Sequence, residues 1–194
     1  MPAFDPETAL VVVDVQNDFA DPRGALYVRE GERTLPSVNA LIRDARAAGA
    51  PVLYSQDWHP ERTPHFDIDG GVWPVHCVAG TWGAELHPDL VVAGPVVRKG
   101  TGGEDGYSAF SVRDPETGEE GSTELGALLA ARGVRRVVVV GLARDVCVAA
   151  TALDARRLGY GAEVVLDATR PVELNPGDDA RAAREMRDAG VTLT

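Results

Sequence analysis

The stretch that decides the fold is Val137-Val138-Val139-Val140-Gly141-Leu142-Ala143-Arg144-Asp145-Val146-Cys147. Its run of valines predicts a strand buried on both faces, which is typical of a parallel sheet. The glycine ends the strand in a tight turn, and Cys147 stands where the next helix is expected to begin. A thiol at that position lies near the positive end of the helix dipole, which favours the nucleophilic thiolate.

Apolar runs of strand length continue on both sides of this stretch and alternate with helical patterns. We expect strands over residues 9–15, 51–56, 91–97, 134–140, 163–166 and 191–193. Apolar residues at helical spacing predict helices over 38–48, from 125 to near 133, over 148–158 and up to 189, each followed by a glycine. The last helix is expected to begin at Pro176 with Asn175 as its N-cap. This alternation predicts the α/β class, a doubly wound, mostly parallel sheet flanked by helices on both faces.

Length and composition indicate one well-cored domain over residues 1–194. The chain has 194 residues, of which 44% are hydrophobic, and a formal net charge of −11. An acidic surface argues against nucleic acid and against an anionic membrane as partners. The chain lacks the pattern of a signal peptide, its apolar runs are too short to span a bilayer, and its two cysteines make no disulfide framework. We therefore expect a cytoplasmic protein with reduced thiols.

Four chemically active residues each follow an apolar strand. They are Asp14, Asp57, Lys99 and Cys147. Taken alone, such a cysteine is usually inert core, such an aspartate often caps a helix, and such a lysine is usually solvated. Parallel strands, however, bring their carboxyl ends to one edge of the sheet, where α/β proteins bind ligands. A carboxylate at Asp14 would cost several kcal/mol unless Lys99 or the Cys147 thiol paired with it, so a shared site is expected.

All histidines of the chain lie in the aperiodic stretch 59–90, and a second aperiodic stretch covers 100–121. Long irregular loops in a compact domain are usually functional. Asp57 and His59 are two residues apart, so in extended backbone they point the same way, and His65 and His76 follow. One aspartate with two or three histidines is a ligand set for a divalent transition metal, namely zinc, or alternatively iron or manganese.

Two further residues of this stretch are left out of the metal set. His87, which precedes a proline, is expected to be solvated at the surface. Cys77 follows His76 directly, and neighbouring side chains of extended backbone point in opposite directions. We therefore expect a structural role for Cys77.

Four sequence blocks in this order make the chain resemble the nicotinamidases (pyrazinamidases) of the isochorismatase-like cysteine hydrolases. The blocks are residues 14–19, residues 57–59 with 65–66 and 73–78, residues 99–100 with 107–110, and residues 141–148. The resemblance implies a metal-containing enzyme that deamidates nicotinamide, and also pyrazinamide, through a thioester. It further implies a place in NAD salvage and assembly as a homo-oligomer.

The same resemblance implies a role for each matching catalytic position. Cys147 resembles the nucleophile, Asp14 the residue that takes the thiol proton and returns it to ammonia, and Lys99 the cation between them. The amides of Ala143 and Cys147 match the family's oxyanion hole, which requires a cis peptide between Leu142 and Ala143. Such a bond outside proline costs about 3 kcal/mol.

The metal and ring positions carry over in the same way. Asp57, His59 and His76 resemble direct metal ligands, whereas His65 binds the ion either directly or through a water. In the family the ion binds the pyridine nitrogen and so orients the ring. Positions that resemble the ring-lining residues are Phe19, Trp73 and Tyr107.

Of three rival interpretations, the first stays open and the other two are disfavoured by the residues present. Another amide or carbamoyl hydrolase of the superfamily would keep the triad and act on a different substrate without the metal. A flavodoxin-like or Rossmann-like oxidoreductase would need a glycine-rich phosphate loop after the first strand, yet no glycine occurs between Asp14 and Gly24. A non-catalytic scaffold would have no need of Asp14, Lys99 and Cys147 together.

One position departs from the resemblance. Arg144 stands where relatives often carry a small residue such as threonine. Its side chain could point to solvent or to a neighbouring subunit, narrow the pocket, or favour an anionic substrate. The departure puts the substrate in question but not the chemistry.

Overall fold

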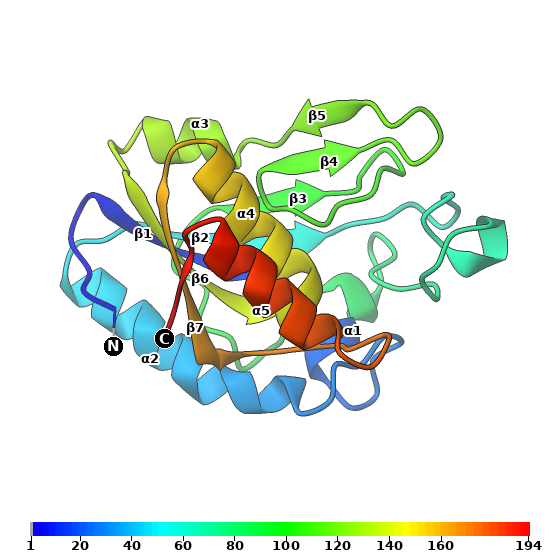
Figure 1. Cartoon of the computed structure of the whole chain (residues 1–194). Coiled ribbons are helices and arrows are strands. Elements are labelled where there is room, and N and C mark those ends of the chain that lie inside the picture. Colours follow the sequence, from blue (N-terminus) through cyan, green and yellow to red (C-terminus); the bar gives the residue numbers. More distant parts are fainter. Residues whose placement is uncertain (1) are drawn as a thin grey trace.

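A parallel sheet of six strands organises the computed structural model, which describes residues 2–194 (Figure 1). The strand order is β3-β2-β1-β6-β7-β8, and every neighbouring pair runs parallel. The predicted α/β class is therefore confirmed. The strands of the sheet are β1 (Thr8–Val13), β2 (Val52–Asp57), β3 (Val96–Lys99), β6 (Arg136–Leu142), β7 (Gly161–Arg170) and β8 (Thr192–Leu193).

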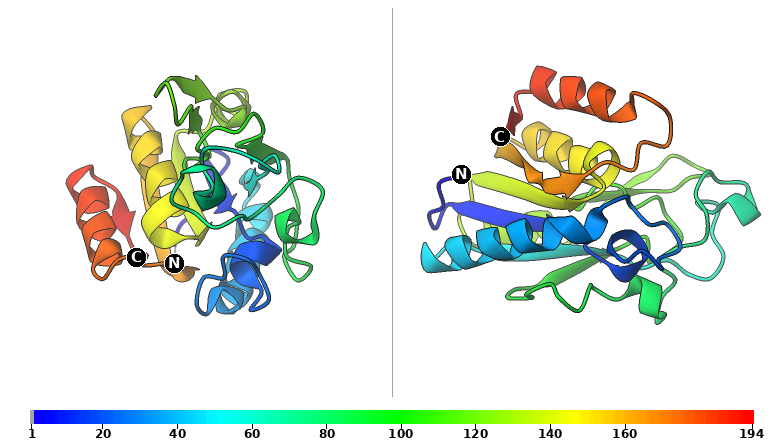
Figure 2. Two further views of the ribbon diagram at one scale, coloured as in Figure 1. Left: turned by 90° about the vertical axis from the view of Figure 1, so that its right-hand side faces the viewer. Right: turned by 90° about the horizontal axis from the view of Figure 1, so that it is seen from below.

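Helices cover both faces of this sheet. Helices α4 (Ala149–Arg157) and α5 (Asp178–Asp188) lie on one face, and α2 (Leu35–Ala47) lies on the other (Figure 2). Each helix presents its apolar residues to the sheet because those residues recur at helical spacing. On the α2 side the buried helical residues are Val38, Leu41, Ile42 and Ala45, and on the α4 side they are Ala149, Ala152 and Ala155. Both layers pack against the valines of β1 and β6, which are buried on both faces.

Short elements complete the fold. Helices α1 (Asn17–Ala20) and α3 (Leu125–Ala130) are short, and single helical turns cover Gly31–Thr34, Asp67–Asp69 and Trp82–Ala84. A π-helical turn over Arg144–Val148 precedes α4. The stretch 100–121 was expected to be irregular, but it includes strand β4 (Ser111–Arg113) and most of β5 (Glu120–Ser122), which form an antiparallel hairpin. The strands of this hairpin are largely exposed and polar, so no apolar alternation marks them.

Several predicted boundaries are wrong, among them the end of the strand predicted over 9–15, which stops at Val13, and three others have clear local reasons. Strand β3 begins at Val96 rather than at residue 91, because the Gly94-Pro95 pair interrupts the run and proline has no N–H to donate. Strand β7 extends to Arg170, where polar residues still pair with β6 beyond a register shift. Helix α5 begins at Asp178 after Gly177, which has a φ of +92°, and not at Pro176.

The strand ends place the reactive residues together. Asp57 and Lys99 are the last residues of β2 and β3, and Asp14 follows β1 directly. The π-helical turn Arg144–Val148, which includes Cys147, follows β6. Strands β1 and β6 are neighbours at the point where the strand order reverses, which is where open α/β sheets bind ligands.

No helix in the described residues 2–194 is long and apolar enough to cross a membrane.

Gly141 allows the close approach of β6 to β1. Its φ is +110°, and a Cβ atom there would collide with the carbonyl oxygen of Val13. We expect Gly141→Ala to lower the free energy of unfolding by about 2–4 kcal/mol, through backbone strain and overpacking. The matched control is Gly126→Ala in α3, where a Cβ meets nothing within 4 Å. That change is expected to be neutral or to stabilise by about 0.5–1 kcal/mol. Urea denaturation measures both, and equal stability of the two variants would contradict this account of Gly141.

Candidate active site

The ammonium group of Lys99 lies at the centre of the reactive residues, and its side chain is fully buried. Its Nζ lies 2.8 Å from Oδ2 of Asp14, also contacts Oδ1 of Asp57, and donates to the carbonyl of Gly106. The sulfur of Cys147 is 3.9 Å away. Burial disfavours the charged form of Lys99, but the carboxylates of Asp14 and Asp57 outweigh this and hold its pKa well above the usual value. Lys99 is therefore a cation at neutral pH.

The carboxylate of Asp14 faces both this cation and the sulfur. Asp14 has a φ of +48°, which turns its side chain away from the path of β1. The hydroxyl of Ser55 donates to Oδ1 at 2.7 Å. Burial raises the pKa of Asp14 to about 6, although the charge of Lys99 lowers it in part. A carboxyl group with this pKa can both accept and donate a proton near neutral pH.

Burial favours the neutral thiol of Cys147, which agrees with a nucleophile whose proton Asp14 is expected to take. Its Sγ lies within 4.8 Å of carboxylate oxygens of Asp14 and Asp57. Burial raises the pKa of Cys147 well above the usual value, and Lys99 opposes this only in part. The sulfur also lies in a π-helical turn before α4 rather than in the first turn of an α-helix. A base must therefore remove its proton before it can attack.

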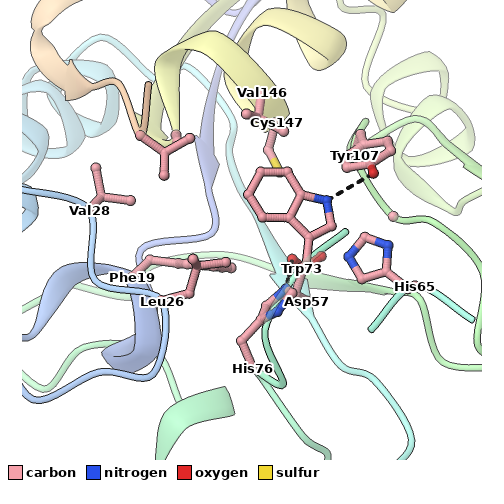
Figure 3. A pocket seen from close by; sticks show the side chains of 13 residues that line it. Phe19, Leu26, Val28, Asp57, His65, Trp73, His76, Tyr107, Val146 and Cys147 are labelled. Carbon is pink, nitrogen blue, oxygen red and sulfur yellow. Dashed lines mark hydrogen bonds and ion pairs between the residues drawn. The ribbon is translucent and has the colours of Figure 1, made fainter. Parts of the chain in front are cut away.

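The sulfur faces a pocket whose lining combines apolar and imidazole side chains (Figure 3). The three predicted ring-lining residues, Phe19, Trp73 and Tyr107, all line it, as do Ala143 and Cys147. The Trp73 indole N–H donates to the Tyr107 hydroxyl at 2.9 Å, which fixes both rings. The peptide bond between Leu142 and Ala143 is cis, as the resemblance implies.

Three buried histidines gather beside Asp57. One ring nitrogen each of His59, His65 and His76 lies within 4.8 Å of the others. Oδ2 of Asp57 is 3.9 Å from Nε2 of His59 and 3.9 Å from Nε2 of His76. Both ring nitrogens of His59 are buried and have no hydrogen-bond partner among residues 2–194. Buried polar atoms are normally paired, so this donor set fits a divalent cation.

The outer contacts of two histidines leave their Nε2 atoms free to bind an ion. Nδ1 of His76 lies 2.7 Å from the carbonyl of Pro74, and Nδ1 of His65 lies 2.5 Å from Oδ1 of Asp105. Both partners only accept, so each Nδ1 carries the proton and each Nε2 keeps its lone pair. Burial lowers the pKa of His59 to about 4 and also lowers that of His76, which keeps these rings neutral.

Sequence reasoning missed the residues that fasten the metal loop to the sheet. The Gln16 amide donates to the carbonyls of Asp57 and Ala84 at 2.8 and 2.9 Å and accepts from the Asp57 N–H at 2.8 Å. Asp18 accepts the N–H of Cys77 at 2.7 Å. Gln16 and Asp18 come shortly after the buried strand β1. Polar residues so close to a buried strand are the feature of the sequence that could have pointed to this role.

His87 and Cys77 were left out of the predicted metal ligands, and only one of their two predicted environments is correct. His87 is buried rather than solvated, and its Nδ1 accepts the N–H of Asp89 at 3.2 Å. It lies outside the cluster of three histidines, so leaving it out of the ligand set agrees with the structure. Cys77 is also buried, with its Sγ 3.9 Å from the carbonyl of Gly83. Its φ of +46°, rather than extended backbone, turns it away from His76.

The guanidinium of Arg144 points away from the pocket. Its Nε and Nη2 each lie 2.7 Å from a carboxylate oxygen of Asp179 in the first turn of α5. Arg144 is absent from the described lining of the pocket. Of the alternatives considered above, narrowing of the pocket and attraction of an anionic substrate therefore lose their structural basis.

Comparisons with known proteins agree with this geometry. A family model described as the isochorismatase domain matches residues 8–194. The chain is 39% identical over 206 residues to the nicotinamidase of Escherichia coli (strain K12), covering 97% of this chain and 94% of that protein. It is similar to the pyrazinamidase of Pyrococcus horikoshii solved in complex with zinc, with a TM-score of 0.85, 40% identity and coverage of 97% and 99% of the two chains. It is also similar to an L. infantum protein solved in complex with nicotinate, with a TM-score of 0.89, 38% identity and coverage of 100% and 95%.

Asp105 offers a test of the ion-binding interpretation. Removing the charge that holds His65 in Asp105→Asn is expected to weaken binding of zinc about 10–100-fold, as loss of an outer partner of a ligating histidine usually does. The neighbouring Glu104→Gln is the matched control, because that carboxylate accepts only the N–H of Gly102, at 2.9 Å, among the described contacts. Competition with a chromophoric chelator measures both affinities. Equal affinity in the two variants would show that Asp105 does not support an ion at His65.

Proposed function

The chain belongs to the isochorismatase family, and we propose that it is an amidohydrolase that converts nicotinamide to nicotinic acid and ammonia, with pyrazinamide as a second substrate. One observation carries the proposal. The Lys99 ammonium contacts Asp14, Asp57 and the Cys147 sulfur at once. It thereby joins a proton acceptor to a nucleophile and an ion-binding cluster that both line one pocket. A small ring that carries a carboxamide fits such a pocket, because the carboxamide needs the nucleophile and the proton acceptor whereas the ring nitrogen needs the ion.

In the first step a bond forms between sulfur and the carboxamide carbon. Asp14 takes the proton of the Cys147 thiol, and the sulfur adds to the carbonyl, whose electron pair moves to oxygen. We assign the amides of Ala143 and Cys147 as donors to this oxyanion, a contribution of about 3–4 kcal/mol. The charge of Lys99 stabilises the sulfur anion and keeps Asp14 able to accept a proton.

In the second step the carbon–nitrogen bond breaks. Asp14 returns its proton to the nitrogen, so ammonia leaves instead of an amide anion, and a thioester to Cys147 remains. A water molecule then gives a proton to Asp14 and adds its oxygen to the thioester carbon. The carbon–sulfur bond breaks, Asp14 reprotonates the sulfur, and nicotinic acid leaves. The balance is one amide and one water to one acid and one ammonia.

The histidine cluster holds the ring end of the substrate in this proposal. Asp57, His59 and His76 would hold one divalent ion directly, with His65 binding it either directly or through a water. We propose zinc, with iron or manganese as the alternatives. When bound, the ion supplies a Lewis-acid site for the ring nitrogen. The ring itself would lie among the three aromatic residues Phe19, Trp73 and Tyr107.

The remaining parts of the proposal concern the setting of the enzyme. We propose that residues 1–194 form one domain, that the chain assembles as a homo-oligomer, and that it acts in NAD salvage in the cytoplasm. The rival within the family is an amide or carbamoyl hydrolase with a different substrate.

Ammonia release from a panel of amides tests the function. We expect release from nicotinamide and pyrazinamide but not from unrelated primary amides, with about one divalent ion bound per chain. Treatment with a chelator should abolish release, and added zinc should restore it. Activity that favours another amide and survives the chelator would support the rival hydrolase instead.

The pH dependence of kcat/KM tests the role of Asp14. Its pKa is raised to about 6, and only the carboxylate form can take the thiol proton. We therefore expect kcat/KM to be low below pH 6, to rise through that value, and to level off above it. Steady-state rates across the acid range measure the curve. A flat profile between pH 5 and 7 would contradict the assignment of Asp14 as the base.

The two cysteines provide a matched pair of variants. Cys147→Ala is expected to lower kcat at least about 10³-fold while fold and metal content persist, because the nucleophile is lost. Cys77→Ala should retain turnover, since Cys77 is buried and lies outside the described pocket lining. Ammonia release and thermal melting measure both variants. Turnover near the wild-type rate in Cys147→Ala would overturn the nucleophile assignment.

A further inference from the structure

Two consecutive residues of the turn that carries Cys147 hold both ends of the connection between β7 and α5, residues 171–177. We propose that Arg144 and Asp145 position this connection so that Val172 forms the wall of the pocket that limits ring substituents on the substrate. The inference rests on the proposed function, because it concerns the substrate of that same pocket. It gives Arg144 a positioning role outside the chemistry.

Asp145 binds the first part of the connection, which follows β7. One carboxylate oxygen accepts the N–H of Val172 at 2.9 Å, and the other accepts the N–H of Glu173 at 2.8 Å. Bonds from N–H groups to a carboxylate are among the stronger hydrogen bonds in proteins. The side chain of Val172 lines the pocket together with Val146 and Cys147. The position of Val172 is therefore set by a residue two places from the sulfur.

Arg144 binds the start of α5, where the connection ends. Its guanidinium and the carboxylate of Asp179 form two parallel bonds of 2.7 Å, and their side chains are only 18% and 28% exposed. The planar guanidinium makes this a directional contact that a threonine could not reproduce. Because Asp179 lies in the first turn of α5, the ion pair fixes where the helix begins relative to the Cys147 turn.

Between these ends the connection is closed by its own hydrogen bonds. The N–H of Gly177 donates to the Glu173 carboxylate at 3.1 Å, and the N–H of Asn175 donates to Asp178 at 2.9 Å. These bonds join its middle to both held ends. A shift of α5 would therefore be transmitted along the connection to Val172.

Val172 belongs to the apolar part of the pocket. The other aliphatic residues of the lining are Leu26, Val28, Ala143 and Val146. In Figure 3, Leu26 and Val28 lie on the side opposite His65 and Tyr107. An aliphatic wall offers no polar partner and acts on a ring by shape alone. An additional methyl group pressed against such a wall changes selectivity by about 10–200-fold.

Selectivity between nicotinamide and its ring-methylated analogues tests the inference. We expect Val172→Ala to raise kcat/KM for at least one methylated analogue, relative to nicotinamide, by about tenfold. Arg144→Gln and Asp179→Asn should move this ratio in the same direction by a smaller factor. The exchange Arg144→Asp with Asp179→Arg should return the ratio toward the wild-type value, a rescue that general loss of stability would not give.

The control is Arg157→Gln, which breaks the 3.0 Å ion pair of Arg157 with Asp154 in α4 and leaves Arg144 bound to Asp179. It should not change the ratio. If nicotinamide is turned over but the ratio of kcat/KM values stays constant in Val172→Ala, the inference is overturned. The same holds if the ratio stays constant in both Arg144→Gln and Asp179→Asn. Failure of the wild type to deamidate nicotinamide would remove the proposed function and this inference together, so the two failures are distinct.

Discussion

The buried ammonium group of Lys99 is the interaction on which the site depends. It contacts carboxylates on either side, Asp14 and Asp57, and lies 3.9 Å from the sulfur of Cys147. Two carboxylates this deeply buried would repel each other and favour protonation if no cation stood between them. One cation thus allows the carboxylate that we propose as the base to stand beside the carboxylate that we propose as an ion ligand.

The sheet explains why this arrangement forms in a chain whose participants are far apart in sequence. Parallel strands end at one edge: β2 and β3 end on Asp57 and Lys99, and β1 and β6 are followed within a few residues by Asp14 and Cys147. Loops beyond that edge then need to be fixed. Gln16 joins the end of β2 to the loop at Ala84, so the same segment that supplies Asp14 also anchors the histidine loop.

Sequence reasoning found the residues whose chemistry conflicts with their local pattern. Asp14 and Lys99 are charged groups at the ends of apolar strands, and that conflict is visible without coordinates. Residues that act through a distant partner were not predictable in this way. Asp105 meets His65 across 40 positions, between two stretches without periodicity, and no spacing rule joins them. The direction of the pKa shift of Cys147 was not predictable either, because the burial that raises this pKa comes from packing that its own helix does not reveal.

The most direct measurement is a crystal structure of the zinc-loaded Cys147→Ala variant with nicotinamide bound. We expect the carboxamide to lie beside residue 147 and Asp14, with the ring nitrogen directed at the ion held by His59 and His76. A carboxamide bound at the histidines, or a ring bound outside the pocket, would contradict this expectation. The catalytic pair Asp14 and Cys147 and the ion-binding cluster at Asp57, which Lys99 joins, would then not hold one substrate.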